Sequence, residues 1–336
     1  MKKSSALFVF LLKIAVGIAL LAVFLFRLDL SQFFQAFSSA RLSYVLLALV
    51  AYLLGKTLTA VRWALLARPL GFSNPLKDFV AFYYIGMFFN LVGPSTLGGD
   101  AGKVFYLSRE TSAGPERGRA EAAALAVVSI LADRIVGMVG LVWIGAAALL
   151  AFPEHVVLIP QLVRYATYAL ALGPVVAWPS FAFGRRLLQK IDHPLAQKLH
   201  ALGSAYWNRP GVLARAAGLS LGFHLIQVWI QILIGRALEF ETPWSYACVF
   251  FPLVDIITML PVSFSGIGLR EGGLLFFLSK LGVAPEKAVA CGILWLAIVI
   301  ASGLVGGLAF VARRRSGPAP DRDLSVSSGE DRTTHL

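Results

Sequence analysis

Charged side chains are scarce in this sequence. Only 14% of its 336 residues are Asp, Glu, Lys or Arg, whereas an ordinary soluble domain carries roughly 25%. Hydrophobic residues make up 58% of the chain. A buried core does not explain so large a deficit, and no stretch of globular composition is long enough to form a separate soluble domain. The composition therefore excludes a soluble protein.

Cysteine is also scarce, and catalytic signatures are missing. The two thiols, Cys248 and Cys291, both fall inside apolar runs, so we expect them to be small buried side chains. Two cysteines exclude a disulfide framework or a cysteine zinc cluster, and the histidines show no metal-ligand spacing. Walker, HExxH and GxSxG sequences are absent. We expect no metal, no other cofactor and no soluble catalytic apparatus.

Long apolar runs dominate what is present. Several reach about 20 residues, the length that crosses about 30 Å of hydrocarbon. The candidate spans are residues 6–26, 43–66, 78–93, 121–151, 158–181, 212–237, 244–262 and 286–311. Residues 101–108 and 272–281 are apolar but too short to span alone. The sequence predicts an all-α polytopic membrane protein with about eight transmembrane helices, and the first run reads as a retained helix because no small-x-small cleavage motif closes it.

The distribution of basic residues predicts the topology. Lys and Arg give the chain a net charge of +12 and lie mostly between apolar runs, where the positive-inside rule and anionic lipid explain them without nucleic acid. A simple serpentine would place the basic residues 109–119 outside and the acidic turn at Glu154 inside, against that rule. The conflict disappears if residues 78–108 and 244–281 each enter and leave on one face. We therefore predict two re-entrant segments, with both termini cytoplasmic in the inner membrane.

Both predicted re-entrant segments contain a helix-breaking sequence. Proline removes a helical hydrogen bond, and glycine permits non-helical backbone angles. The predicted hinge residues are Gly93, Pro94, Gly98 and Gly99 in the first break and Pro261, Gly266 and Gly268 in the second. Two interrupted segments of opposite orientation, one in each half, indicate an inverted repeat with a site at its interface. The alternative is two ordinary turns outside the membrane.

Ionisable residues within apolar runs mark a candidate site. Each costs about 2.5–3.5 kcal/mol on insertion scales, so such residues usually face partners or water. Asp133 and Arg134 lie in the middle of one span, and Asp255 lies deep in another. Small residues share the face of Asp133 at helical spacing and would let a neighbouring helix pack closely; they are Ala126, Ser129, Gly137 and Gly140. A purely structural ion pair of Asp133 and Arg134 with neighbours is the alternative.

Charged residues also follow each break. Asp100 and Lys103 come after the first, and Arg270 and Glu271 after the second. Free backbone N–H groups at a broken helix favour anions, so these residues together with Arg134 predict a phosphate site. The alternative is that they cap the short helices.

Other polar residues within the spans receive a simpler interpretation. We expect Lys56 to lie inside the bundle. Arg62, Trp63 and Arg68 should anchor a helix end at the cytoplasmic interface, as Arg and Trp commonly do. We expect His224 to be a hydrogen-bonded helix-packing group.

The sequence resembles a known family. Gly93-Pro94-Ser95 through Gly98-Gly99-Asp100, then Asp133-Arg134 with Gly137, then Pro261 through Gly266-Ile267-Gly268-Leu269-Arg270-Glu271 are similar to the lysylphosphatidylglycerol synthase transmembrane-region family, over about residues 8–312. The resemblance implies a bacterial inner-membrane protein with re-entrant helices around a central cavity. It implies handling of a lipid with an anionic or derivatised head group. No soluble aminoacyl-transferase domain follows the last span, so synthesis of lysylphosphatidylglycerol is not implied.

The leading hypothesis is a lipid translocase of flippase type. It consists of one membrane domain, residues 1–312, and a disordered cytoplasmic tail, residues 313–336. Lys103, Arg134 and Arg270 would hold the head-group phosphate, and the acidic residues would set cavity polarity or couple to protons. The alternatives are a membrane-embedded lipid-modifying enzyme and a non-catalytic partner of a lipid-modifying or glycosyl-transfer enzyme. The identity of the lipid stays open.

Overall fold

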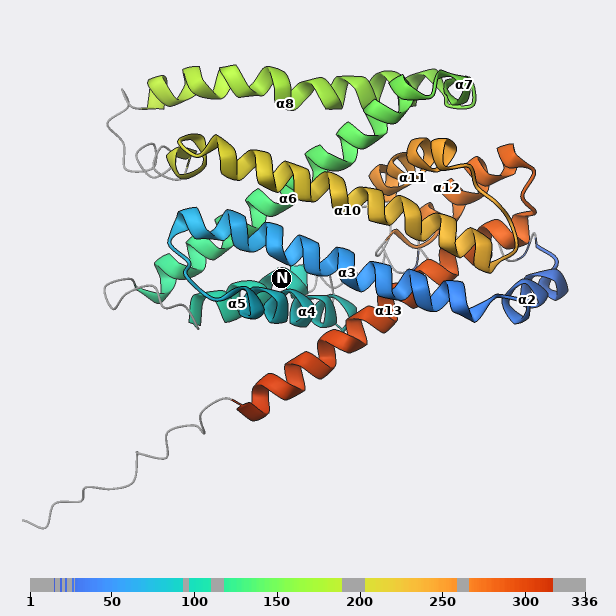
Figure 1. Ribbon diagram of the computed structural model, residues 1–336, viewed down its shortest axis with the longest axis horizontal. Coiled ribbons are helices and arrows are strands. Elements are labelled where there is room, and N and C mark those ends of the chain that lie inside the picture. Colours follow the sequence, from blue (N-terminus) through green and yellow to red (C-terminus); the bar gives the residue numbers. More distant parts are fainter. Residues whose placement is uncertain are drawn as a thin grey trace, which may run out of the picture.

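The computed structural model describes residues 28–92, 97–109, 118–188, 203–258 and 266–316, together with four single positions before residue 28. Every regular element in these ranges is helical, as predicted (Figure 1). The helices are α2 (Leu30–Ser38), α3 (Leu42–Ala67), α4 (Leu76–Val92), α5 (Leu97–Arg109), α6 (Arg119–Ala151), α7 (Pro153–Val156), α8 (Gln161–Leu188), α10 (Pro210–Ala237), α11 (Trp244–Thr258), α12 (Leu269–Leu278) and α13 (Pro285–Ser316), with 3₁₀ turns η1 (Arg68–Leu70) and η3 (Ser279–Leu281).

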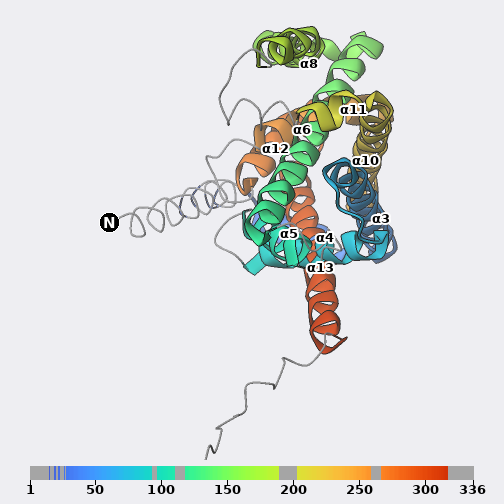
Figure 2. The same ribbon diagram turned by 90° about the vertical axis from the view of Figure 1, so that its left-hand side faces the viewer.

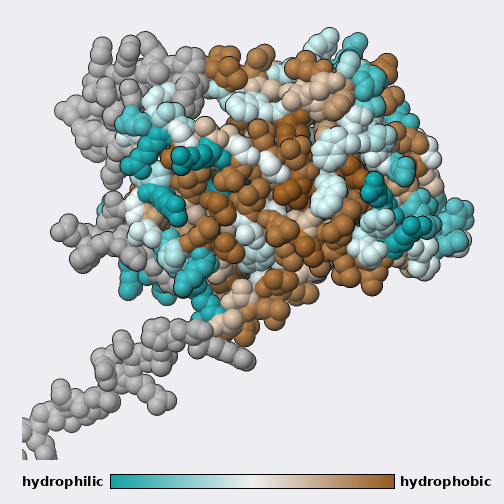
Figure 3. Space-filling view, in the orientation of Figure 1, coloured by the Kyte–Doolittle hydropathy of each residue, from teal (hydrophilic) through white to brown (hydrophobic). Residues whose placement is uncertain are grey.

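Four long helices in the described ranges are apolar enough to cross a membrane. They cover Leu42–Leu70, Arg119–Ala151, Pro210–Ala237 and Pro285–Arg313. At 1.5 Å per residue each is about 40 Å or longer, which exceeds a hydrocarbon core of about 30 Å. Hydrophobic side chains form a broad band across the middle of the face seen in Figure 3. The chain is therefore a multi-pass membrane protein. The predicted span at residues 6–26 lies almost entirely outside the described residues.

Helices α4 and α5 form an antiparallel hairpin. The side-chain oxygen of Asn90 accepts a hydrogen bond from the backbone N–H of Gly99 at 2.8 Å. Farther from the connection, the rings of Phe82 and Tyr106 stack with centroids 5.5 Å apart. Gly99 permits this approach, because a Cβ built there would lie 2.6 Å from the amide carbon of Asn90. The hairpin therefore begins and ends at the same end of the bundle. The predicted hinge residues Gly93 and Pro94 lie outside the described residues.

Helices α11 and α12 form a second antiparallel hairpin. The hydroxyl of Tyr246 donates to the carbonyl oxygen of Phe277 at 2.8 Å, and Gly273 packs against Val254. Near the connection, Gly266 and Gly268 have φ angles of +75° and +83°. Only glycine adopts these left-handed angles without steric cost, which explains this residue type at the turn into α12. Pro261 lies outside the described residues.

The order of packing repeats in the two halves of the chain. One half consists of α3, the α4–α5 hairpin and α6, and the other of α10, the α11–α12 hairpin and α13 (Figures 1 and 2). Helix α4 packs on α13 of the other half, and α11 packs on α6 in return. Within each half the second arm of the hairpin packs on the long helix that follows it. The long helices α3 and α10 lie side by side and antiparallel, and the backbone N–H of Arg41 donates to the carbonyl of Ala237 at 2.9 Å.

Candidate functional site

A buried ion pair joins α3 to α6. The Arg62 Nε donates to the Asp133 Oδ1 at 2.7 Å, and the two side chains are only 5% and 9% exposed. The Arg62 Nη1 also donates to the hydroxyl of Ser220 on α10 at 2.9 Å. The interpretation of Arg62 and Trp63 as interface anchors was therefore wrong, since both are buried. Their partners come from α6 and α10, which are distant in sequence. Arg68, by contrast, is exposed.

The small-residue face of α6 is what brings these groups together. A Cβ built at Gly137 would lie 3.1 Å from the Arg62 Nη2, and one at Gly140 would lie 2.9 Å from the Ser220 Cβ. Glycine at both positions therefore leaves room for the arginine and for α10. The Nε2 of His224 lies 2.9 Å from the Gly137 carbonyl oxygen, which confirms His224 as a helix-packing group.

A second ionic group joins α5 to α6. The Arg134 Nε donates to the Asp100 Oδ2 at 2.7 Å, and the Arg134 Nη2 contacts the same oxygen. The Lys103 Nζ lies 3.5 Å from the Asp100 Oδ1. Asp133 and Arg134 are neighbours in sequence but point to different sides of α6, because successive residues of a helix are rotated by about 100°. They pair with different helices rather than with each other.

Tyr83 of α4 connects these pairs to Lys56. The Lys103 ammonium lies 4.1 Å from the centroid of the Tyr83 ring, and Tyr83 is within electrostatic range of Lys56 and Asp133 as well. The Lys56 ammonium lies 4.8 Å from the Tyr52 ring centroid, so Lys56 is inside the bundle as predicted. Nothing in the sequence distinguished Tyr83 from its aromatic neighbours, because its role depends on contacts with two other helices.

The charges after the second break have different surroundings. The Glu271 Oε2 accepts from the backbone N–H of Gly268 at 2.6 Å, so this buried carboxylate caps α12. The Arg270 guanidinium lies 5.7 Å from the Trp295 ring centroid, and its Nε has no hydrogen-bond partner among the described residues. Asp255 is within electrostatic range of both Arg270 and Lys56. Lys56 therefore lies within electrostatic range of Tyr83 on the first hairpin and of Asp255 on the second.

Together these groups form a set that we call the interior polar cluster. Its members are Lys56, Arg62, Asp100, Lys103, Asp133, Arg134, Asp255, Arg270 and Glu271. Five are cations and four are carboxylates, so in their ordinary ionised forms one positive charge is left over. The set consists of the seven charged site candidates named from the sequence together with Lys56 and Arg62, and a role of these seven in ligand binding stays a prediction. A positive excess among partly buried groups favours an anionic ligand.

Helix α10 also carries a polar stripe that was not predicted from the sequence. Ser220, His224, Gln227 and Gln231 recur at spacings of four, three and four, and all are buried. The Gln231 Oε1 accepts from the Cys291 thiol at 3.4 Å. Helical spacing of uncharged polar residues could have indicated this stripe, but such residues carry a weaker signal than charges. In the part of the chain that the structure describes, no group of His, Cys, Asp or Glu is arranged to hold a metal.

Comparison with known proteins gives two matches. The family described as "Lysylphosphatidylglycerol synthase TM region" matches residues 10–307 of this chain. A protein of Methanothermobacter thermautotrophicus, described as "UPF0104 membrane protein", is 22% identical over 303 residues. That alignment covers 82% of this chain and 87% of the relative.

Proposed function

Because the chain belongs to the lysylphosphatidylglycerol synthase transmembrane region family, we propose that it is a lipid translocase of the bacterial inner membrane. It binds the anionic head group of a lipid, or of a lipid-linked precursor, at the interior polar cluster. The observation that carries this proposal is the excess of cations in that cluster, together with the Arg270 Nε, for which the described ranges supply no hydrogen-bond partner. A buried guanidinium nitrogen in that state is costly until an acceptor reaches it.

Each cation has a defined place in the proposal. Arg270 offers its free Nε to the phosphate, while Lys103 and Arg134 supply charge from the other hairpin and already share Asp100. Asp255 lies within electrostatic range of Arg270 and of Lys56. An arriving phosphate would compete with Asp100 for Lys103 and Arg134. This exchange of partners provides a way for head-group binding to alter the packing of α5 on α6.

The two hairpins provide the moving parts. We propose that α4–α5 and α11–α12 enter the membrane from opposite faces as re-entrant segments of an inverted repeat. Support comes from the antiparallel pairing within each hairpin and from the reciprocal packing of α4 on α13 and α11 on α6. Rocking of such repeats around a midplane site is a common route to alternating access.

This topology makes a labelling prediction. Single cysteines that replace the exposed residues Lys77 and Arg119 should both react with an impermeant thiol reagent from the cytoplasmic face. A cysteine at Glu154, beyond the other end of α6, should react only from the periplasmic face. The native Cys248 and Cys291 are buried and provide a low background. Labelling of position 119 from the periplasm would contradict the re-entrant arrangement of α4–α5.

The functional test is scrambling of labelled lipids in proteoliposomes. Wild-type protein should move at least one anionic lipid between leaflets, and Arg270→Ala should slow this at least about tenfold, because hydrogen bonds to charged groups contribute about 1.5–3 kcal/mol. Lys280→Ala is the matched control. Its ammonium also lies over an aromatic ring, that of Phe276 at 5.2 Å, but Lys280 is exposed at the far end of the same hairpin.

Two outcomes would overturn the translocase proposal. One is equal scrambling by wild-type and Arg270→Ala protein across all labelled lipids. The other is chemical conversion of the lipid by the purified protein without its movement, which would favour a membrane-embedded enzyme.

A further inference from the structure

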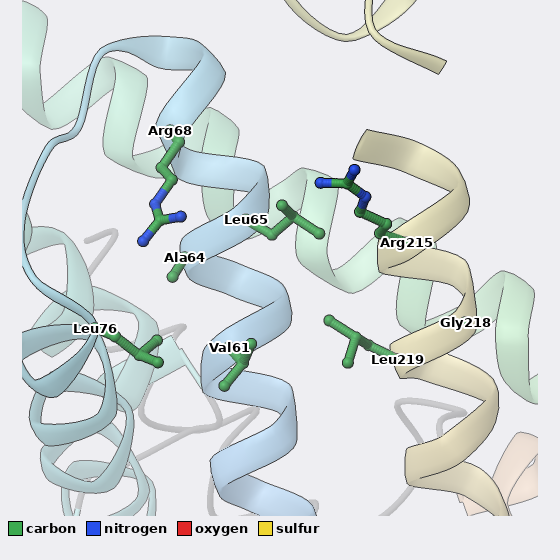
Figure 4. A pocket seen from close by; sticks show the side chains of 8 residues that line it. All are labelled: Val61, Ala64, Leu65, Arg68, Leu76, Arg215, Gly218 and Leu219. Atoms are coloured by element: carbon green, nitrogen blue, oxygen red, sulfur yellow. The ribbon is translucent and has the colours of Figure 1, made fainter. Parts of the chain in front are cut away.

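A groove of about 500 Å³ separates the end of α3 from the start of α10 (Figure 4). Because these helices are antiparallel, both walls of the groove belong to the same end of the bundle. Its lining is apolar except for two arginines, Arg68 of η1 directly after α3 and Arg215 on α10. The groove is separate from the interior polar cluster, none of whose members lines it.

The two arginines are available to a ligand. Both are exposed. Neither forms an ion pair with an acidic side chain in the described ranges, whereas Arg62 and Arg134 do. Leu76, at the start of α4, adds apolar surface beside Arg68. The mouth of the groove therefore carries two unneutralised positive charges.

The groove changes from charged at its mouth to apolar toward the middle of the two helices. Val61 lies seven residues before Arg68 on α3, and Leu219 lies four residues after Arg215 on α10. At 1.5 Å per residue these apolar side chains are about 10 Å and 6 Å closer to the middle of the helices than the arginines. Figure 4 shows Leu65 and Leu219 projecting into the gap between the helices, with Val61 on the face of α3 beside it. The groove is thus cationic at the membrane surface and apolar below it.

We propose that this groove binds one anionic glycerophospholipid, with its phosphate between Arg68 and Arg215 and an acyl chain against Val61, Leu65 and Leu219. The two arginines favour a ligand with an anionic head group, because their charges are complementary to it. The apolar side chains deeper in the groove favour a ligand that also has a lipid tail. Arginine suits phosphate because its planar guanidinium donates two parallel hydrogen bonds. The positive-inside rule places this end of α3 and α10 in the cytoplasmic leaflet. The site does not depend on whether the protein moves lipid.

Gly218 offers a substitution that fills the groove without disturbing the fold. It lines the groove on α10, and a Cβ built there meets nothing within 4 Å. Leucine also favours a helix more than glycine does. Gly218→Leu should therefore fold normally and place its side chain where the acyl chain would lie.

Native mass spectrometry of the full-length protein, titrated with phosphatidylglycerol or phosphatidylcholine, tests the proposal. Wild-type protein should hold one phosphatidylglycerol in preference to phosphatidylcholine. Arg68→Gln and Arg215→Gln should each weaken its binding about fivefold, from the value of about 1 kcal/mol for each basic residue near an anionic surface. Gly218→Leu should lower binding of phosphatidylglycerol with no loss of thermal stability. Arg209→Gln, an exposed arginine at the N-cap of α10 outside the groove, should leave binding unchanged.

Three results would overturn the assignment. The first is equal affinity for the two lipids. The second is unchanged phosphatidylglycerol binding in both Arg68→Gln,Arg215→Gln and Gly218→Leu proteins. The third is displacement of the lipid by glycerol 3-phosphate at the same concentration as by phosphatidylglycerol, since a site that uses the tail cannot treat the bare head group as equivalent.

Discussion

Replacing Asp133 by leucine is expected to destabilise the protein by about 3–5 kcal/mol, because it leaves the Arg62 guanidinium buried without a counter-charge. Arg62 is only 5% exposed at its side chain and lies between α3, α6 and α10. The hydroxyl of Ser220 remains as a partner, but a hydroxyl does not neutralise a cation. Equilibrium unfolding in mixed micelles, followed by circular dichroism, measures the loss.

The double variant Arg62→Met,Asp133→Leu distinguishes two contributions to stability: the destabilisation caused by one buried charge without a partner, and the net stabilisation that the intact ion pair provides. Buried ion pairs replaced by apolar residues of similar size often keep or gain stability. The double variant should therefore be more stable than Asp133→Leu alone. Arg41→Gln, which breaks the exposed pair with Glu239 at 3.2 Å, should cost less than about 1 kcal/mol. If Asp133→Leu and Arg41→Gln lowered the free energy of unfolding by the same amount, the interior ion pair would contribute no more to stability than the exposed one.

Replacing Gly306 by alanine is expected to cost about 1–3 kcal/mol, as overpacking of a tight interface usually does. A Cβ built at Gly306 of α13 would overlap the carbonyl oxygen of Tyr84 on α4 and lie 2.8 Å from its carbonyl carbon. These are backbone atoms, so no change of rotamer relieves the clash. The two helices would have to move apart, and the packing of α4 against α13 would be lost.

Gly173→Ala is the matched control for this change. Gly173 lies within α8, and a Cβ built there meets nothing within 4 Å. Alanine favours a helix more than glycine by about 1 kcal/mol, so this variant should be as stable as wild type or more so. The same unfolding measurement applies to both variants. If Gly306→Ala proved as stable as Gly173→Ala, the close approach of α4 to α13 would be wrong.

These two contacts bear on the proposed translocation in different ways. The Arg62–Asp133 pair fixes α6 against the long helices α3 and α10. Gly306 fixes the first hairpin, through α4, against the second half of the chain. Asp100 and Arg134 connect α5 to α6 at a more exposed position, where Arg134 is 47% exposed at its side chain. The exposed ionic contact is the one that can exchange partners with a head group, whereas the buried contacts are suited to hold the frame.

Much of the architecture followed from the sequence. Apolar runs of about 20 residues specify membrane helices because unpaired backbone groups are not tolerated in hydrocarbon. That constraint acts on each segment alone, so composition and length predicted the spans that became α3, α6, α10 and α13. The small-residue face around Asp133 was also readable, because helical spacing is a local property.

The sequence did not predict which side chains would form ion pairs and hydrogen bonds with one another. Arg62 lies near the end of a span and resembled an interface anchor, yet the fold buries it. Its carboxylate is 71 residues away in the chain. Glu271 looked equally suited to a cavity and to a cap, and the hydrogen bond from the Gly268 N–H shows that it caps α12. Tyr83 gave no signal that set it apart, and the helical spacing of the polar stripe on α10 gave only a weak one.

The sequence by itself determined that this is a helical membrane protein and that charged residues lie within its apolar spans, because both follow from the length and composition of single segments. Only the tertiary structure decided which charges meet, which cations have no acidic partner among the described residues, and where a groove opens beside Arg68 and Arg215. Those outcomes depend on distances between helices far apart in the chain. Such distances are set by the packing of the whole bundle, and no local pattern contains them.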